Sequence, residues 1–227
     1  MKLALLIGVN AGFSLACYFL RLLSASGSFS GFLIAALIGF FLGWPGWTML
    51  MVFFGAGTAA TFFRRGKKER RGVAQPDHGR RRWNHAWANA GCAVFCAGAA
   101  WLMARQGHRQ TAEAWRWAFV ACFASALSDT LSSEFGQVAD QQPRLITTGE
   151  LVPVGTDGGV TRAGFLMGVL GAAILTLVAR FSDLVPVRAT LPLLVAGLSG
   201  NLVDSLLGAT LQRRGWLGND SVNFANT

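Results

Sequence analysis

Apolar residues form long runs along the whole chain, and short polar segments separate them. A run of ~20 mostly apolar residues is long enough to cross a bilayer as an α-helix. Seven runs approach this length: Leu3–Leu22, Phe29–Leu42, Trp47–Phe63, His85–Met103, Ala114–Phe135, Val160–Phe181 and Thr190–Leu211. We therefore predict an all-α fold, a polytopic membrane bundle of about six to seven transmembrane helices within one domain, residues 1–227. A large helical soluble protein is the alternative.

The second run is short, and Gly43-Trp44-Pro45-Gly46 follows it directly. Gly and Pro in adjoining positions are typical of a tight turn. The second and third runs therefore form a hairpin, either of two full spans or of one re-entrant element. The first run has only Lys2 before it and no small-residue cleavage site, so we interpret it as a span rather than a signal peptide.

Composition supports the membrane class. The chain is 52% hydrophobic and 14% charged, whereas charged residues make up ~25% of soluble domains. All four cysteines lie in apolar runs, which indicates small core residues rather than a disulfide framework. Cys92 and Cys96 are one helical turn apart, but no third Cys or His lies near them in the sequence, so zinc binding is not expected.

Basic residues are concentrated in one polar segment, residues 64–83, which holds nine of the 20 Lys and Arg. Such a segment stays on the cytoplasmic side of a membrane. Counting spans outward places 14 of the 20 on that side and the N-terminus outside. The other side keeps Lys2, Arg105, Arg109, Arg116, Arg180 and Arg188. The net charge of +9 therefore needs no nucleic acid. Attraction to anionic lipid or substrate is a second role that this loop could have.

A short internal repeat relates two of the predicted spans. The stretch Leu127–Leu131 reads LSDTL and Leu202–Leu206 reads LVDSL, and Gln137 and Gln212 follow at the same offset. Both stretches end spans that run in the same direction. We interpret this as a parallel repeat of two helical hairpins, His85–Gln137 and Val160–Gln212, with chance similarity as the alternative.

Acidic residues inside these spans are the first candidates for chemistry, because ionisable groups in membrane helices are costly and usually functional. Asp129, Glu134 and Asp204 are the three, and Asn201 lies three residues before Asp204. In an unbroken helix Glu134 points well away from Asp129. Carboxylate and amide oxygens are ligands that Mg²⁺ prefers. Polar helix packing is the alternative role.

A Gly-rich segment, Gly155-Thr156-Asp157-Gly158-Gly159, runs into the sixth span. Free backbone N–H groups and the helix dipole make such a helix start suitable for anions. Thr156 or Asp157 would cap the helix, and Arg162 in its first turn would pair with a phosphate. A plain turn with a helix cap is the alternative.

Asparagines complete the set of polar candidates: Asn84, Asn89, Asn219, Asn223 and Asn226. On the predicted topology, the acidic residues, the Gly-rich loop (residues 139–159) and these asparagines all lie on the cytoplasmic side.

The chain resembles a known family at these residues. The stretches are Ala88-Asn89, Ser128–Gly136, Gly155–Thr161, Asp204–Gln212 and Val222-Asn223-Phe224. They are similar to the integral-membrane family of domain of unknown function ninety-two, which includes transmembrane protein nineteen and the plant phytyl-phosphate kinase. The resemblance extends from about Arg82 to Thr227, and the family pattern implies one more membrane helix beyond it.

The resemblance implies a multi-pass cell-membrane enzyme with a cytoplasmic active face. It would be a kinase that uses CTP and Mg²⁺ to convert an isoprenoid monophosphate lipid to the diphosphate. Asp129, Glu134, Asp204, Thr156 and Asn89 inherit site roles through their motifs. We predict Asp129, Asp204 and Glu134 as metal ligands and Arg162 as a catalytic cation. The predicted nucleotide- and phosphate-binding residues are Asn89, Gly155, Thr156, Asp157, Gly158, Gly159, Thr161, Asn201, Ser205 and Asn223.

Two other functions fit part of the pattern. A transporter or flippase of an anionic lipid would also contain repeats and intramembrane acids. A structural protein with polar helix packing is the third hypothesis. The clustering of motifs at one face, rather than at the midplane, favours the enzyme.

Overall fold

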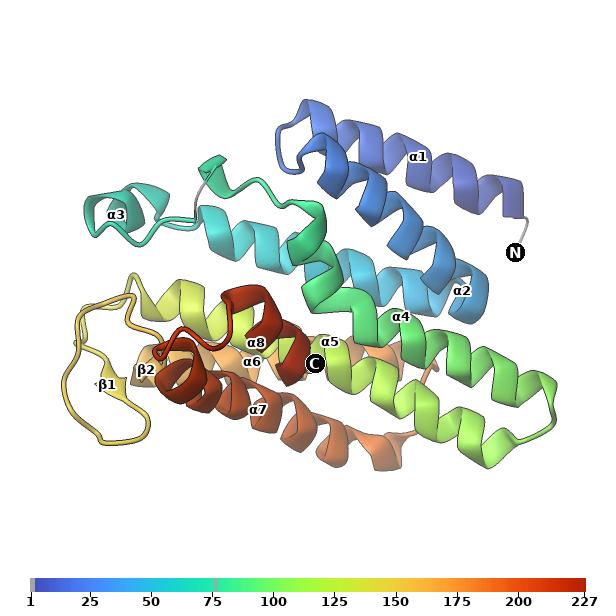
Figure 1. The fold of residues 1–227 in the computed structure, drawn as a ribbon. Coiled ribbons are helices and arrows are strands. Elements are labelled where there is room, and N and C mark those ends of the chain that lie inside the picture. Colours follow the sequence, from blue (N-terminus) through green and yellow to red (C-terminus); the bar gives the residue numbers. More distant parts are fainter. Residues whose placement is uncertain (1–2, 76) are drawn as a thin grey trace.

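The computed structural model describes residues 3–75 and 77–227, and most of them are helical. The helices are α1 (Leu3–Phe19), α2 (Ala25–Phe62), α3 (Arg65–Arg70), α4 (Trp83–Arg105), α5 (Arg109–Gly136), α6 (Arg162–Phe181), α7 (Thr190–Leu207) and α8 (Asn219–Asn226). Three single-turn elements are η1 (Asp77–Gly79), η2 (Val187–Ala189) and the π-type η3 (Gly208–Gln212). Two short strands, β1 (Arg144–Leu145) and β2 (Gly159–Val160), pair antiparallel. The predicted all-α membrane fold is confirmed (Figure 1).

The long helix α2 is a hairpin. Gly43 interrupts it with φ 68° and ψ −156°, and Pro45 follows two residues later. Gly27, near its start, and Gly57, near its end, both lie against Arg81, so the two arms run antiparallel (Figure 1). At 1.5 Å per residue each arm is about 27 Å long, close to the ~30 Å of a bilayer core. The predicted turn is confirmed, and the arm lengths favour two full spans.

The remaining long helices alternate in direction, with α5 and α7 running the same way (Figure 1). The elements long and apolar enough to cross a membrane in the described part of the chain are α2, α4, α6 and the segment Val187–Gln212, and α1 is a shorter apolar helix. The helix α5 packs against α4, α6 and α7. This arrangement matches the two predicted hairpins, α4–α5 and α6–α7.

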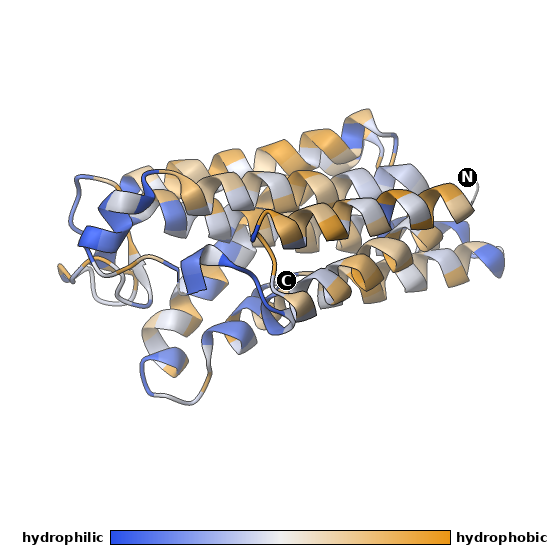
Figure 2. Cartoon of the chain, turned by 90° about the horizontal axis from the view of Figure 1, so that it is seen from above, coloured by the Kyte–Doolittle hydropathy of each residue, from blue (hydrophilic) through white to orange (hydrophobic). Residues whose placement is uncertain are grey.

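The centre of the bundle is α5, where Phe119, Phe123 and Leu127 are fully buried. The adjoining helix α6 approaches it closely at Gly171, where a Cβ would lie 2.7 Å from the Leu127 carbonyl oxygen. Small residues allow such contacts between membrane helices. The outer surface is apolar instead: Phe29 and Phe181 are 71% and 81% exposed. Hydrophobic residues therefore cover the long helices, while hydrophilic residues gather in α3 and the loops (Figure 2).

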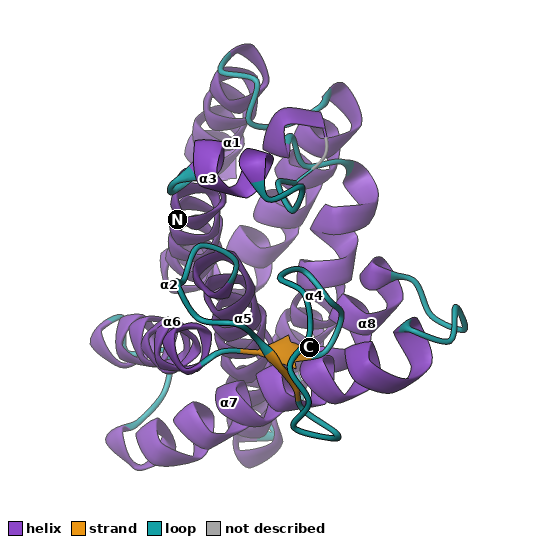
Figure 3. Cartoon of the chain, turned by 90° about the vertical axis from the view of Figure 1, so that its left-hand side faces the viewer, coloured by secondary structure: helices purple, strands orange, loops and turns teal. Residues whose placement is uncertain are grey.

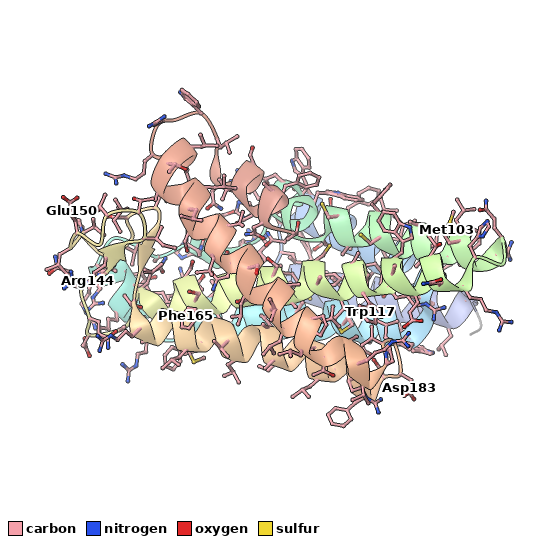
Figure 4. The ribbon with its side chains drawn as sticks, turned by 90° about the horizontal axis from the view of Figure 1, so that it is seen from below. Met103, Trp117, Arg144, Glu150, Phe165 and Asp183 are labelled. Carbon is pink, nitrogen blue, oxygen red and sulfur yellow. The ribbon has the colours of Figure 1, made fainter. Side chains whose placement is uncertain are left out.

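The basic segment docks on the end of α5. Lys67 Nζ donates to the Val138 carbonyl at 2.8 Å, and Arg71 Nη1 donates to the carbonyls of Gln137 and Ala139 at 2.8 and 2.9 Å. Helix C-termini carry unsatisfied carbonyls that cations stabilise. The loop between α5 and α6, with Arg144 in it, lies at the same end, and Met103 and Asp183 lie at the opposite one (Figure 4).

Candidate functional site

A cavity of about 240 Å³ opens at the end of the bundle that carries α3 and the β1–β2 loop. Its walls come from the second arm of α2, the segment before α4, the ends of α5 and α7, and α8. Seen from this end, the two strands lie over the bundle and α8 lies beside α4 (Figure 3). Elements distant in the sequence thus converge on one polar space.

Two of the carboxylates that line the cavity are Asp129 of α5 and Asp204 of α7. The carboxyl groups lie within hydrogen-bonding reach of each other, and the Ser133 hydroxyl lies beside Asp129. The predicted hairpin repeat therefore brings equivalent acids together. Because both helices run in the same direction, each delivers its Asp at the same depth of the bundle.

The helix α8 contributes a partner for this pair. Asn226 Nδ2 donates to Asp204 Oδ1 at 2.7 Å, and the Ser125 hydroxyl donates to the Asn226 backbone carbonyl at 2.8 Å. Asn226 is buried. The sequence indicated an asparagine cluster in this segment, but only the fold assigns one of its members to Asp204.

Glu134, the third predicted acid, does not join the aspartates. Lys68 Nζ lies 2.5 Å from Glu134 Oε2, and both side chains are buried. Glu134 Oε1 accepts from Thr61 Oγ1 at 3.1 Å and from Gln75 Nε2 at 3.4 Å. The unbroken helix α5 turns Glu134 away from Asp129, so the predicted separation of the two side chains is confirmed. Its assignment as a metal ligand stays a prediction, and the structure gives its charge a different partner.

The Gly-rich loop also lines the cavity, although its glycines have packing roles of their own. Gly158 has φ 74°, and a Cβ there would lie 2.5 Å from the Ala209 backbone nitrogen. Gly155 has φ 88° and would meet Val73. Both positions therefore need glycine to dock the loop on its neighbours.

The cap of α6 differs from the prediction. Thr161 is the N-cap, and its hydroxyl accepts from the Gly164 N–H at 3.0 Å. Thr156 instead donates its hydroxyl hydrogen to the Pro153 carbonyl at 2.8 Å. Capping by Thr156 or Asp157 was wrong, because β2 separates these residues from the helix. Burial raises the pKa of Asp157, and the charge of Arg213 partly opposes this.

Most predicted site residues reach the cavity, and two do not. Those that line it are Asn89, Asp129, Glu134, Gly155, Thr156, Asp157, Gly158, Gly159, Thr161, Asp204, Ser205 and Asn223. Arg162 is exposed outside the lining, because its position at the start of α6 turns it outward. Asn201 is buried where α7 packs on Gly168 of α6. The structure therefore does not support a site role for either residue.

Arg80 and Arg81 line the cavity instead. The backbone of Arg81 is fixed by its N–H, which donates to Leu22, and by its carbonyl, which accepts from Ser24. Burial lowers the pKa of the Arg81 guanidinium, while the charge of Glu134 opposes this shift. Neither arginine was a predicted site residue, because the sequence does not distinguish them from the other cations of the basic loop, for which topology and attraction of anions were the two roles considered.

Among residues 3–75 and 77–227, no three His, Cys, Asp or Glu side chains come together as a potential metal site. The aspartate pair therefore offers two carboxylates, and water or substrate oxygens would have to complete the coordination of a cation there.

Sequence comparisons place the chain among membrane proteins. Residues 8–227 match the family described as Integral membrane protein DUF92. Protein VTE6, chloroplastic, of Arabidopsis thaliana is 34% identical over 209 residues, covering 90% of this chain and 62% of that protein. Protein PGR of the same plant is 34% identical over 214 residues, covering 86% and 73%.

An uncharacterized membrane protein of Methanocaldococcus jannaschii is 44% identical over 111 residues, covering 48% of this chain and 45% of that protein. The chain thus spans less than two thirds of the length of the VTE6 protein and of the Methanocaldococcus jannaschii protein. No solved structure shows significant similarity. The family match over nearly the whole length, together with the helical bundle, shows that the chain belongs to the DUF92 family of integral membrane proteins.

Proposed function

We propose that this protein is a CTP-dependent kinase that converts an isoprenoid monophosphate to the diphosphate at the cytoplasmic face of the membrane. The observation that carries the proposal is the Asp129–Asp204 pair, set in one polar cavity with the Gly-rich loop. Phosphoryl transfer depends mainly on positioning and on neutralising charge. A cavity with these groups at a helix end matches both needs.

The aspartate pair is suited to a divalent cation. Two carboxylates within hydrogen-bonding reach repel each other unless a proton or a cation lies with them. Mg²⁺ commonly uses one or two carboxylates and completes its coordination with water and substrate phosphates. Asp129 and Asp204 would hold it, and Asn226 would orient Asp204. When bound, Mg²⁺ supplies charge neutralisation of the transferring phosphate.

Other residues of the cavity would bind and orient the substrates. The amide side chains of Asn89 and Asn223 line the wall, and amides can both donate to and accept from a nucleotide. The backbone of the Gly-rich loop would contact phosphate oxygens. A monophosphate acceptor is already anionic and nucleophilic, so the cavity needs no strong general base.

The exposed surface of α7 supports a lipid substrate. Leu202 and Leu206 are 41% and 44% exposed on either side of half-buried Asp204. An isoprenoid tail can therefore lie in the bilayer against this helix while its phosphate enters the cavity. A soluble acceptor would not require this apolar surface beside the carboxylate.

A transporter or flippase of an anionic lipid is the second candidate, because the two hairpins resemble a parallel repeat. In transporters the binding site lies near the bilayer midplane, whereas this cavity opens at one end of the bundle. The position of the cavity favours the kinase.

The test is incubation of purified protein with labelled CTP, Mg²⁺ and a panel of isoprenyl monophosphates. We expect isoprenyl diphosphate from the wild type and none from Asp129→Asn. If the wild type makes no diphosphate with CTP or with any other nucleotide, the kinase is excluded. Lipid transport in vesicles would then be measured.

A further inference from the structure

The guanidinium of Arg81 is a cation of the cavity wall. It is half-buried, and its side chain makes no hydrogen bond or ion pair within residues 3–75 and 77–227. Arginine presents five N–H donors in a planar fork that matches phosphate oxygens. Unused donors at a cavity wall are therefore available to an anion that enters.

The acid whose charge acts on Arg81 is already engaged by other partners. Glu134 influences Arg81 electrostatically, but its two oxygens already accept from Lys68, Thr61 and Gln75. Lys68 neutralises it at 2.5 Å. The local balance around Glu134 and Lys68 is thus close to zero, and the charge of Arg81 remains in excess.

The position of Arg81 is fixed by packing rather than by a salt bridge. Its Cζ lies 5.9 Å from the ring centroids of both Phe53 and Phe54. Gly57 leaves the space for it, since a Cβ there would lie 2.8 Å from Arg81 Nη2. A guanidinium held in place before the ligand arrives loses little entropy on binding.

We infer that Arg81, and not Arg162, binds a phosphate group of the substrates in this cavity. The inference deepens the proposed kinase function, on which its catalytic meaning rests, because it names the residue that holds the anion. Thr130, next to Asp129, lies across the same gap from Gly57 and Arg81. The aspartates and the arginine therefore surround one space with opposite charges, as a phosphate bound together with a cation requires.

The experiment measures binding of inorganic pyrophosphate to the full chain in detergent, in the presence of Mg²⁺. Pyrophosphate contains neither a nucleobase nor a lipid tail, so its binding reports on the phosphate site alone and does not depend on the reaction. We expect Arg81→Gln to weaken binding about 10- to 100-fold, in line with lost charge-assisted hydrogen bonds. Arg81→Lys keeps the charge but loses the planar fork of donors, and its pyrophosphate affinity should lie between those of the wild type and Arg81→Gln. Arg162→Gln is the matched control and should bind like the wild type.

A second measurement uses the unmutated protein. Phenylglyoxal modifies accessible arginines, and mass spectrometry reports each site. Pyrophosphate should slow modification of Arg81 at least several-fold and leave Arg162 unchanged. Equal modification of Arg81 with and without pyrophosphate would overturn the inference, even if Arg81→Gln does not fold.

The outcomes separate this inference from the proposed function. Protection of Arg81 by pyrophosphate, without diphosphate synthesis from any isoprenyl monophosphate, would support the anion site at Arg81 and contradict the proposed kinase activity. Synthesis that persists in a folded Arg81→Gln protein, with wild-type pyrophosphate affinity, would keep the kinase and remove Arg81 from it.

Discussion

Lys68 Nζ, in the short helix α3, lies 2.5 Å from Glu134 Oε2 at the end of α5, and the two side chains are 1% and 3% exposed. Lys68 also donates to the carbonyls of Ala60 at 2.7 Å and Thr61 at 3.1 Å, in the last turns of α2. One cation therefore ties two helix ends together beside the cavity.

Removing only the cation should be severely destabilising. Lys68→Met keeps most of the volume but leaves Glu134 buried without its partner, which costs about 3–5 kcal/mol. Thermal unfolding in detergent measures the loss. Arg70→Met is the control and should change little, because the Arg70 side chain is exposed. The double variant Lys68→Met/Glu134→Leu should be more stable than Lys68→Met, and equal or lower stability would show that the pair is not coupled.

The arrangement of the loops predicts a labelling pattern. In a background without the four native cysteines, single cysteines at Arg70, Thr148 and Trp216 should react with an impermeant reagent only from the cytoplasmic side. Gln106, in the turn between α4 and α5 at the opposite end, should react only from outside. If some of the first three positions reacted from one side of the membrane and the others from the opposite side, the loops around the cavity would not share one face.

Asp129→Asn and Asp204→Asn should each abolish Mg²⁺-dependent nucleotide binding while the protein stays folded, since an amide replaces a carboxylate at nearly constant volume. Titration with CTP, with and without Mg²⁺, measures the effect. Asp183→Asn, at the other end with a side chain 92% exposed, is the control. Unchanged binding in either variant would assign that aspartate to helix packing.

Asn226 should act as a positioning residue for Asp204. Asn226→Ala removes the amide that donates to Asp204 but leaves the backbone carbonyl for Ser125. We expect about tenfold more Mg²⁺ to be needed for half-maximal nucleotide binding, the usual effect of losing a group that orients a ligand. Ser221→Ala, on the exposed side of α8, should have no effect. An Mg²⁺ requirement that does not move would leave Asn226 with a packing role only.

Two glycines of the same loop should respond differently to alanine. Gly149 has φ 76° and open space around it, whereas at Gly158 an added Cβ meets the Ala209 backbone. Gly149→Ala should cost only the backbone strain of about 1–2 kcal/mol, and Gly158→Ala should cost more because Ala209 must move. Unfolding midpoints compare the two. Equal losses of stability in the two variants would mean that the contact between Gly158 and the Ala209 backbone does not require glycine.

The sequence predicted the spans well, because membrane helices need long apolar runs and the basic loop is concentrated in one place. The acids at Asp129 and Asp204 were found for the same reason, since a repeat places them at equivalent depth. The partners of these acids were not predictable. Pairing Lys68 with Glu134, or Asn226 with Asp204, depends on side-chain contacts between segments that the sequence does not relate.

The helix cap that was predicted incorrectly lies at the start of α6, after the Gly-rich loop. Arg162 was expected at the site because it occupies the first turn of α6, but the direction of its side chain depends on where the helix begins. A two-residue strand, β2, delays that start until after Thr161. Such short pairings have no clear sequence signal, so the cap was assigned to the wrong residue, and the role of Arg162 stays a prediction for a residue outside the cavity lining.

The basic segment between α2 and α4 links the way the chain inserts into the membrane to the way its helix ends are held together. Charges of this kind direct which way a chain inserts into a membrane, and Lys67, Lys68 and Arg71 also donate to carbonyls in the last turn of α2 and directly after α5. Moving these charges to other loops in order to invert the protein would at the same time free those carbonyls and strip Glu134 of its counter-ion. The same side chains would therefore carry both the insertion signal and the contacts beside the cavity, so a variant made to change one would also change the other.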